Sequence, residues 1–291
     1  MTRLQRFKIW VWSTCRALSP ALEHQLKRRF SKTYWANWGE RTRQAVACPD
    51  NAFIPRVKNA GRIIDGVQIM HNGLKVRTGS YYGKESVKLL QRNLGVHEPQ
   101  EERVFQEVLK QVPPGSVIIE LGAYWSFYSM WFCSVVPGAK AFMVEPIAEN
   151  ITFGKDNFSL NGFLGHFTHS WVGASSGIAT DGAPIMCVDD FVAKHGLEEI
   201  GILHSDIQGF ELDMLKGSER ILSHQKISYT FISTHTEELH VACDQFLRNK
   251  GYILVASIRP ADSYSMDGIL VHRAPHTPAI PPIELSRKPV A

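Results

Sequence analysis

The sequence lacks the cysteine spacing of a metal centre and contains few cysteines of any kind. Its 291 residues include five cysteines, with no C-x-x-C pair and no H-E-x-x-H motif. An odd number of scattered thiols argues against a disulfide framework and favours reduced thiols in a cytosolic protein. No apolar run approaches the roughly 20 residues of a membrane-spanning helix. The run Ile9–Trp12 is too short for the apolar part of a secretory signal.

The sequence also lacks a strong net charge, since its formal charge is only +4. This small value hides an uneven distribution. Residues 1–43 contain ten of the 32 basic and two of the 28 acidic residues, so this segment carries +8 and the remainder −4. The segment is also aromatic, which is typical of contact with an anionic surface, either nucleic acid or lipid headgroups. The alternative, which we favour, is a helical cap whose charges face water.

The most informative stretch is the short apolar run Val117–Leu121, which contains Glu120 and is followed by Gly122. Its β-branched residues predict a strand buried on both faces. The apolar segment 127–132 predicts a helix directly after the turn. A strand, a tight glycine turn and a helix present free backbone N–H groups to a ligand. The alternative is an ordinary strand–turn–helix with a solvated glutamate.

A second acid, Glu145, ends another buried-strand pattern 25 residues after Glu120. A carboxylate at this position can accept hydrogen bonds from both hydroxyls of a ribose. Glu120 argues against a dinucleotide, because its charge would repel phosphate and the G-x-G-x-x-G fingerprint is missing. The pattern favours S-adenosylmethionine, which has a ribose, an ammonium and a sulfonium but no phosphate.

The order of the patterns predicts an α/β fold with three parts. Residues 1–95 form an N-terminal helical and hairpin extension, with hairpin turns at Asp65–Gly66 and Asn72–Gly73. Residues 96–273 alternate strands and helices and end in an antiparallel strand pair, which predicts a mostly parallel sheet with one reversed strand. Residues 274–291 contain five of the fifteen prolines and are expected to form an open Pro-rich tail.

Polar residues follow several predicted strands at their carboxyl ends, where ligands bind in such sheets. They are Glu120, Glu145, Asp206 with Gln208, and His235. Histidine titrates near neutral pH, so His235 is a candidate base, although a structural role is equally open. If His235 is structural, Asp206 and the polar helix start at His97–Glu98 are the next candidates.

A metal site is an alternative at the same edge. Asp206, His235 and Asp267 could hold a divalent ion that acidifies a hydroxyl. No ligand spacing in the sequence supports this alternative, so we expect no metal. His204 shares a strand face with Asp206 but lies deeper, and we interpret it as a buried histidine satisfied by a backbone carbonyl.

From about Glu98 to Val271 the sequence resembles the FkbM family of S-adenosylmethionine-dependent methyltransferases. The family pattern around the first strand is an acid followed by Gly-Ala-Asn-x-Gly-x-x-Ser. In this sequence Tyr124 replaces the Asn and Ser126 replaces the second Gly. The matching residues are Glu120, Gly122, Ala123 and Ser129.

The most specific match is the segment 204–211, followed by Leu215–Gly217. The family pattern is Lys-x-Asp-x-Glu-Gly-x-Glu, followed by Leu-Lys-Gly. His204 replaces the Lys and Gln208 replaces the first Glu, while Asp206 is kept.

The resemblance implies a Rossmann-like class I methyltransferase fold and O-methylation of a sugar or small metabolite. From their positions at strand ends we expect Asp206 and His235 to be catalytic, and from the thiols a cytoplasmic location. The expected cofactor-binding residues are Glu120, Gly122, Ala123, Ser126, Glu145, Pro146 and Asp206. Two alternatives stay open: a degenerate scaffold whose pocket Tyr124 and Trp125 fill, and a nucleotide-dependent oxidoreductase.

Overall fold

The structure is a computed structural model that describes residues 32–179 and 182–289. The chain divides into two compact units, Met1–Arg43 and Gln44–Ala291. Helix α3 (Lys32–Ala47) crosses the boundary between them. Most of the basic segment 1–43 therefore lies outside the described residues, and its predicted roles stay predictions.

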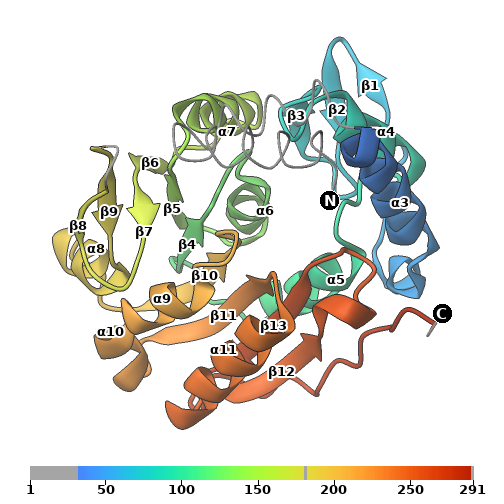
Figure 1. The fold of residues 1–291 in the computed structure, drawn as a ribbon. Helices are drawn as coiled ribbons and strands as arrows, with labels where there is room; N and C mark the ends of the chain where they lie inside the picture. The colour runs from blue at the N-terminus through green and yellow to red at the C-terminus, as the bar shows by residue number, and fades with distance from the viewer. Residues whose placement is uncertain (1–31, 180–181, 290–291) are drawn as a thin grey trace, which may run out of the picture. The chain divides into compact units, whose positions relative to one another are not determined.

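The centre of the second unit is a seven-stranded sheet with the spatial order β12-β13-β11-β10-β4-β5-β6 (Figure 1). Strand β13 is antiparallel to both of its neighbours, and the other adjacent pairs are parallel. The predicted mostly parallel sheet with one reversed strand is therefore confirmed. The strands are β4 (Val117–Leu121), β5 (Lys140–Glu145), β6 (His166–His169), β10 (Ile200–Ser205), β11 (Ile227–Thr234), β12 (Ile253–Ile258) and β13 (Gly268–Arg273).

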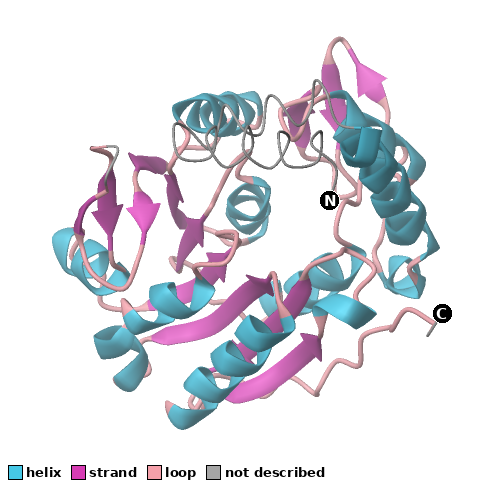
Figure 2. Ribbon diagram, viewed as in Figure 1, coloured by secondary structure: helices cyan, strands magenta, loops and turns pink. Residues whose placement is uncertain are grey.

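Helices cover both faces of this sheet, which explains why its central strands β4 and β10 are buried along their whole length (Figure 2). On one face, Phe105 of α5 packs on Phe231 of β11 with ring centroids 5.2 Å apart. On the other face, α8 to α11 share one hydrophobic core with Ile119 and Leu203. The helices are α5 (Pro99–Leu109), α6 (Phe127–Val135), α7 (Ala148–Leu160), α8 (Val188–Lys194), α9 (Glu211–Lys216), α10 (Glu219–Ser223) and α11 (Glu237–Asn249).

The predicted hairpins precede this core as a small antiparallel sheet. It consists of β1 (Ile63–Ile64), β2 (Val67–Ile69) and β3 (Lys75–Arg77). Positive φ angles of 50° at Asp65 and 75° at Gly66 give the tight turn that this dipeptide predicted. The sheet is tied to α7, because the backbone N–H of Arg77 donates to Asn157 Oδ1 at 2.8 Å.

Shorter elements complete the second unit. A second small sheet contains β7 (Trp171–Val172), β8 (Gly177–Ile178) and β9 (Pro184–Met186). Helix α4 (Lys84–Arg92) follows the hairpins, and two 3-10 helices lie at Pro49–Phe53 (η1) and Pro260–Asp262 (η2). In the described parts of the chain, no helix is both long and apolar enough to cross a membrane.

The expectation of an open C-terminal tail is wrong for residues 274–289. The backbone N–H of Ile283 donates to Val255 O at 2.9 Å, and that of Ser286 donates to Asp50 Oδ2 at 3.0 Å. Leu285 is buried between these two contacts. Proline prevents regular structure here, but the remaining backbone donors still find partners on the core.

Candidate active site

The carboxyl ends of β5, β4, β10 and β11 lie side by side at one edge of the sheet (Figure 1). Leu121 at the end of β4 is in register with Val144 of β5 and Ser205 of β10. Asp206 directly follows β10, and His235 directly follows β11. The structure therefore brings the predicted strand-end residues to a common edge.

Gly122 allows the turn after β4 to approach the end of β10 closely. Its φ is +73°, and a Cβ at this position would overlap the carbonyl oxygen of Asp206. The backbone N–H groups of Gly122 and Ala123 donate to Val144 O on β5, at 2.9 and 3.1 Å. The turn is thus held between the two neighbouring strands, and only glycine fits its first position.

Glu120 faces the interior rather than the open edge. The side chain is buried, and its Oε2 accepts a hydrogen bond from the backbone N–H of Ser129 at 3.0 Å. Burial raises the pKa of Glu120. Because Ser129 lies in α6, this carboxylate holds the first turn of that helix behind the glycine turn.

Glu145 is buried at the end of β5, with most of its hydrogen-bonding capacity already used. Oε1 accepts from the backbone N–H of Ile147 and from Asn150 Nδ2, both at 3.0 Å. Oε2 accepts from the backbone N–H of Tyr124 at 3.1 Å. A carboxylate oxygen can accept two hydrogen bonds, so Oε2 keeps one position for a ligand hydroxyl. Pro146, the next predicted residue, is half-buried.

The two residues of this turn that differ from the family pattern, Tyr124 and Ser126, both have left-handed backbones, with φ of 42° and 63°. Ser126 is fully buried. Its Oγ faces Gly154 of α7, where a Cβ would lie only 2.5 Å away. The Tyr124 hydroxyl accepts from the backbone N–H of Tyr82 at 3.1 Å.

Trp125, which the scaffold alternative placed in the pocket, belongs to an aromatic stack. Its ring lies 4.6 Å from that of Tyr81 and 5.3 Å from that of Phe127. The side chain is 4% exposed. Trp125 is therefore part of the core packing beside α6.

His235 is the centre of a group that we name the acceptor-edge cluster: Asp206, Glu211, His235 and Asp267. Its Nδ1 lies 2.8 Å from Glu211 Oε1. Its Nε2 lies 3.2 Å from Asp206 Oδ1 and 3.6 Å from Asp267 Oδ1. The side chains of Asp206 and Asp267 are 31% and 27% exposed, so the cluster is accessible from solvent.

The charges of this cluster are mutually dependent. Burial alone would lower the pKa of His235, but hydrogen bonds and charge from the surrounding carboxylates outweigh it and raise the pKa to about 11. In return, His235 holds the pKa of Asp206 below its ordinary value despite burial. At neutral pH the ring is therefore an imidazolium that orients ionised carboxylates.

The residues of the metal alternative, Asp206, His235 and Asp267, do meet at this edge. However, no group of three or more His, Cys, Asp or Glu side chains in the described ranges is suited to hold a metal ion. The described geometry is that of an imidazolium held by carboxylates.

Glu101 of α5 connects the two strands directly beneath the cluster, a role that no sequence pattern indicated. Its Oε1 lies 2.8 Å from His204 Nε2, and its Oε2 accepts from Ser233 Oγ at 3.1 Å. His204 and Ser233 stand two residues before Asp206 and His235 on their strands. His204 is buried as expected, but its partner is a carboxylate rather than a backbone carbonyl. A pattern of acids in the first turn of a helix predicts capping and does not reveal such a partner.

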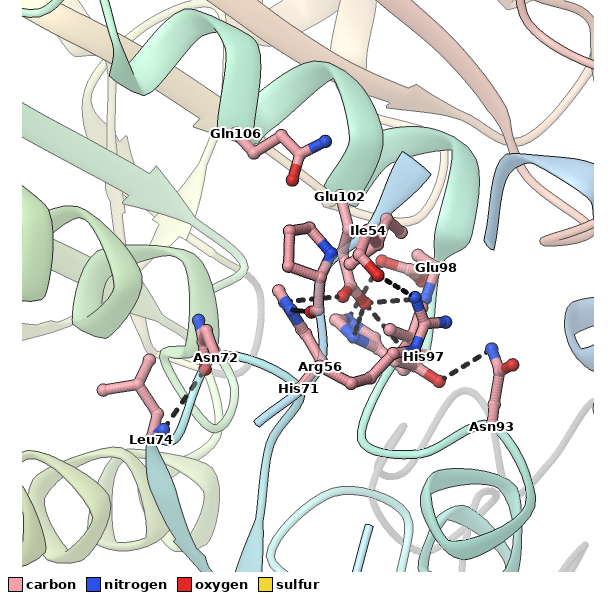
Figure 3. Close-up of polar contacts among 12 residues, drawn as sticks. Ile54, Arg56, His71, Asn72, Leu74, Asn93, His97, Glu98, Glu102 and Gln106 are labelled. Carbon is pink, nitrogen blue, oxygen red and sulfur yellow. Dashed lines mark hydrogen bonds and ion pairs between the residues drawn. The ribbon is translucent and has the colours of Figure 1, made fainter. Parts of the chain in front are cut away.

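The helix start at His97–Glu98 is part of a second group, the sealed cluster: His71, His97, Glu98 and Glu102 (Figure 3). His97 Nδ1 lies 2.7 Å from Glu102 Oε1, and His97 Nε2 lies 3.1 Å from Glu98 Oε2. The His97 and Glu102 side chains are 2% and 0% exposed. His97 is therefore enclosed and does not reach the open edge, contrary to the sequence-based alternative.

A cavity of about 320 Å³ adjoins the sealed cluster at His71. Its lining includes Arg56, Gln106, Lys110 and Trp131 but no predicted site residue. Lys110 is paired with Glu107 at 2.6 Å. The cavity is therefore separate from the acceptor-edge cluster.

The mostly parallel seven-stranded sheet with one reversed strand, covered by helices, is the Rossmann-like arrangement of class I methyltransferases. Residues 84–254 match the family model described as the methyltransferase FkbM domain. The chain belongs to the FkbM methyltransferase family. This confirms the predicted family and the methyl donor expected with it, S-adenosylmethionine.

Individual relatives are distant. A curated protein of Jannaschia sp. (strain CCS1), which carries a provisional methyltransferase name, is 28% identical and aligns over 55% of this chain and 73% of its own length. The structure of M. capricolum TrmK with S-adenosyl-homocysteine is 13% identical, with a TM-score of 0.41 over 60% of this chain and 69% of that chain. Precorrin-6y C5,15-methyltransferase from Geobacter metallireducens is 15% identical, with a TM-score of 0.41 over 59% and 87%.

Proposed function

We propose that this methyltransferase acts on oxygen, transferring the methyl group to a hydroxyl of a sugar or small metabolite. The observation that carries the proposal is the acceptor-edge cluster. It places solvent-accessible carboxylates of Asp206 and Asp267 around one imidazolium beside the Gly122 turn. A hydroxyl needs a hydrogen-bond acceptor that orients it and takes its proton, and these carboxylates meet that need.

The cofactor, when bound, supplies a methyl group on a positively charged sulfonium. Two features of the site fit it. Glu145 Oε2 keeps one acceptor position for a ribose hydroxyl, next to the turn of Gly122 and Ala123. The charge of Asp206 suits the cationic end of the molecule. Glu120, Ser126 and Pro146 would support this binding surface from behind, since Glu120 and Ser126 are buried.

Asp206 is the group that accepts the proton of the acceptor hydroxyl, and His235 is the group that orients the Asp206 carboxylate. The pKa of His235 is raised to about 11, so the ring has no free lone pair for a proton at neutral pH. Asp206 Oδ1 lies 3.2 Å from His235 Nε2 and accepts from Gln208 Nε2 at 3.0 Å, which fixes the carboxylate in one orientation. The chain thus orients the acceptor and removes its proton, while positioning provides the remaining rate enhancement.

Cofactor binding is the first test. S-adenosylhomocysteine should raise the melting temperature, because it binds the folded protein. Glu145→Ala should weaken this ligand by about 10-fold or more, the scale of losing hydrogen bonds to an ionised acceptor. Glu149→Ala is the matched control, since Glu149 is an exposed acid in the first turn of α7.

The same experiment separates the rival functions. No melting shift with millimolar S-adenosylhomocysteine would favour the scaffold, and a shift with NAD alone would favour the oxidoreductase. Contact of residues 1–43 with an anionic surface and the cytosolic location stay predictions, supported by the basic aromatic composition and the scattered thiols.

A further inference from the structure

Two exposed apolar residues directly precede two of the carboxylate residues that contact His235. Phe210 is 53% exposed and directly precedes Glu211, whose Oε1 lies 2.8 Å from His235 Nδ1. Met266 is 43% exposed and directly precedes Asp267, whose Oδ1 lies 3.6 Å from His235 Nε2. The two apolar residues are therefore chain neighbours of the groups at the two nitrogens of one ring.

The exposure of Met266 does not come from a loose loop. Gln100 Oε1 accepts from Ser263 Oγ at 3.0 Å and from the backbone N–H of Tyr264 at 2.8 Å. Ser265 is buried directly before Met266, and strand β13 begins two residues after it. The backbone is anchored before and after Met266, so the fold holds this apolar side chain in a solvent-exposed position.

Phe210 is held in the same way. Glu211 Oε1 accepts from the backbone N–H of Gly209 at 3.0 Å, and Phe210 is the N-cap residue of α9. Glu211 is fully buried. The aromatic ring therefore projects from an anchored turn, next to a carboxylate that contacts His235.

Each of these two loops contains one residue with a strained backbone. Met266 has a φ of 75° and Gln208 has a φ of 57°, conformations that non-glycine residues rarely adopt. Such a conformation persists only where the surrounding structure fixes it, often at ligand-binding sites. Gln208 follows Asp206 by two residues, and Met266 precedes Asp267, so both strained residues adjoin the acceptor-edge carboxylates.

We propose that Phe210 and Met266 bind the apolar body of the acceptor, which makes the substrate a hydroxyl on a flat apolar skeleton, such as a phenol or catechol. This inference rests on the proposed function and names its substrate class. Covering two exposed apolar side chains gains free energy in proportion to the area removed from water. A thioether also makes favourable contacts with an aromatic ring. A bare sugar presents hydroxyls on most of its surface and would leave this apolar area poorly covered.

Two probes with a vicinal diol distinguish the classes: catechol and methyl α-D-glucopyranoside. Dissociation constants are measured by ligand-observed NMR on the full chain saturated with S-adenosylhomocysteine. Catechol should bind at least about 10-fold more tightly than the glucoside, a difference of about 1.4 kcal/mol. Phe210→Ala and Met266→Gln should each weaken catechol about 3-fold to 10-fold. Leu164→Ala is the control, because Leu164 is 93% exposed and lies between α7 and β6.

The outcomes are distinct from those of the proposed function. Equal or tighter binding of the glucoside, or catechol affinity that both substitutions leave unchanged, would overturn the apolar acceptor. So would the failure of both probes to bind while S-adenosylhomocysteine binds. If S-adenosylhomocysteine itself does not bind, the result contradicts the proposed function, and the apolar acceptor falls with it. Unchanged melting temperatures of Phe210→Ala and Met266→Gln show that any loss of binding is local.

Discussion

The acceptor-edge cluster and the sealed cluster use the same residue types for different purposes. Each places one histidine between carboxylates, and in each the pKa of that histidine is raised, to about 11 at His235 and about 10 at His97. The clusters differ in access. The carboxylates facing His235 Nε2 are 27–31% exposed, whereas the Glu102 side chain beside His97 is fully buried (Figure 3).

This difference teaches that a perturbed pKa alone does not identify an active site. A buried pair has lost its water and depends on its partner, so removing one member costs mainly stability. A part-exposed pair keeps water and can exchange it for a ligand, so removing one member should cost mainly function. The following substitutions test that division.

The largest effect on stability is expected for Glu102→Gln. Glu102 Oε1 accepts from the backbone N–H groups of His97 and Glu98 at 2.8 and 3.0 Å, besides its contact with the His97 ring. The substitution leaves a buried imidazolium short of one carboxylate, which costs about 3–5 kcal/mol of unfolding free energy. Urea denaturation measures the loss. Asp267→Asn in the part-exposed cluster should cost less than about 1 kcal/mol.

The pH dependence of stability checks the same assignment. Burial lowers the pKa of His97, but Glu98 and Glu102 outweigh it and raise the pKa from 6.5 to about 10. A raised pKa stabilises the fold fully below pH 6.5, and this contribution is lost as pH rises through about 10. The unfolding free energy should therefore fall between these values, and less steeply in Glu102→Gln than in Asp267→Asn. Equal slopes in the two variants would contradict the division.

The next largest effect is expected for turnover in His235→Ala. The substitution removes the cation that holds Asp206 and Asp267, and turnover should fall by about 100-fold, the usual contribution of a positioned proton-transfer group. Cofactor affinity should change little, because its proposed contacts lie on β4 and β5. Release of S-adenosylhomocysteine with a saturating acceptor measures the rate.

The pH profile of the wild type assigns the proton acceptor. The pKa of Asp206 is below its ordinary value of 3.8 and that of His235 is about 11, so neither group titrates between pH 6 and 8. The rate should be flat across this range and insensitive to a chelator. A rate that falls as pH drops through about 7 would return the base to neutral His235, the candidate base in the sequence. Loss of activity with a chelator would favour the metal alternative instead.

The sequence predicted the sheet and its edge because local patterns carry that information. The apolar strands, the reversed last strand and the turn at Gly122 follow from hydrophobic runs and turn residues. The sequence did not predict the partners of Glu101 and Glu102. Both lie in the first turn of a helix, where acidic residues are expected because they interact favourably with the helix dipole. It also missed the docked tail, since the contact between Ser286 and Asp50 spans 236 positions. Contacts between residues so far apart depend on the assembled fold.

The last comparison concerns His204, where the sequence departs from the family pattern. This residue lies beneath Asp206, with Glu101 Oε1 at 2.8 Å and with Glu120 opposite on β4. Burial lowers the pKa of His204, but these carboxylates outweigh it and raise the pKa above its ordinary value. The surrounding carboxylates therefore favour the charged form of His204.

His204→Lys introduces the family residue and keeps a positive charge between Glu101 and Glu120. Its unfolding free energy should stay within about 1.5 kcal/mol of the wild type, the usual cost of a tolerated change in side-chain shape. His204→Met has a similar length but no charge, and it leaves two buried carboxylates without their cation, so about 3 kcal/mol or more should be lost. Urea denaturation compares the two variants. Equal losses would show that the fold needs the ring of His204 for packing and does not need its charge. Such a result would contradict an electrostatic link between the acceptor-edge cluster and the buried carboxylates of Glu101 and Glu120.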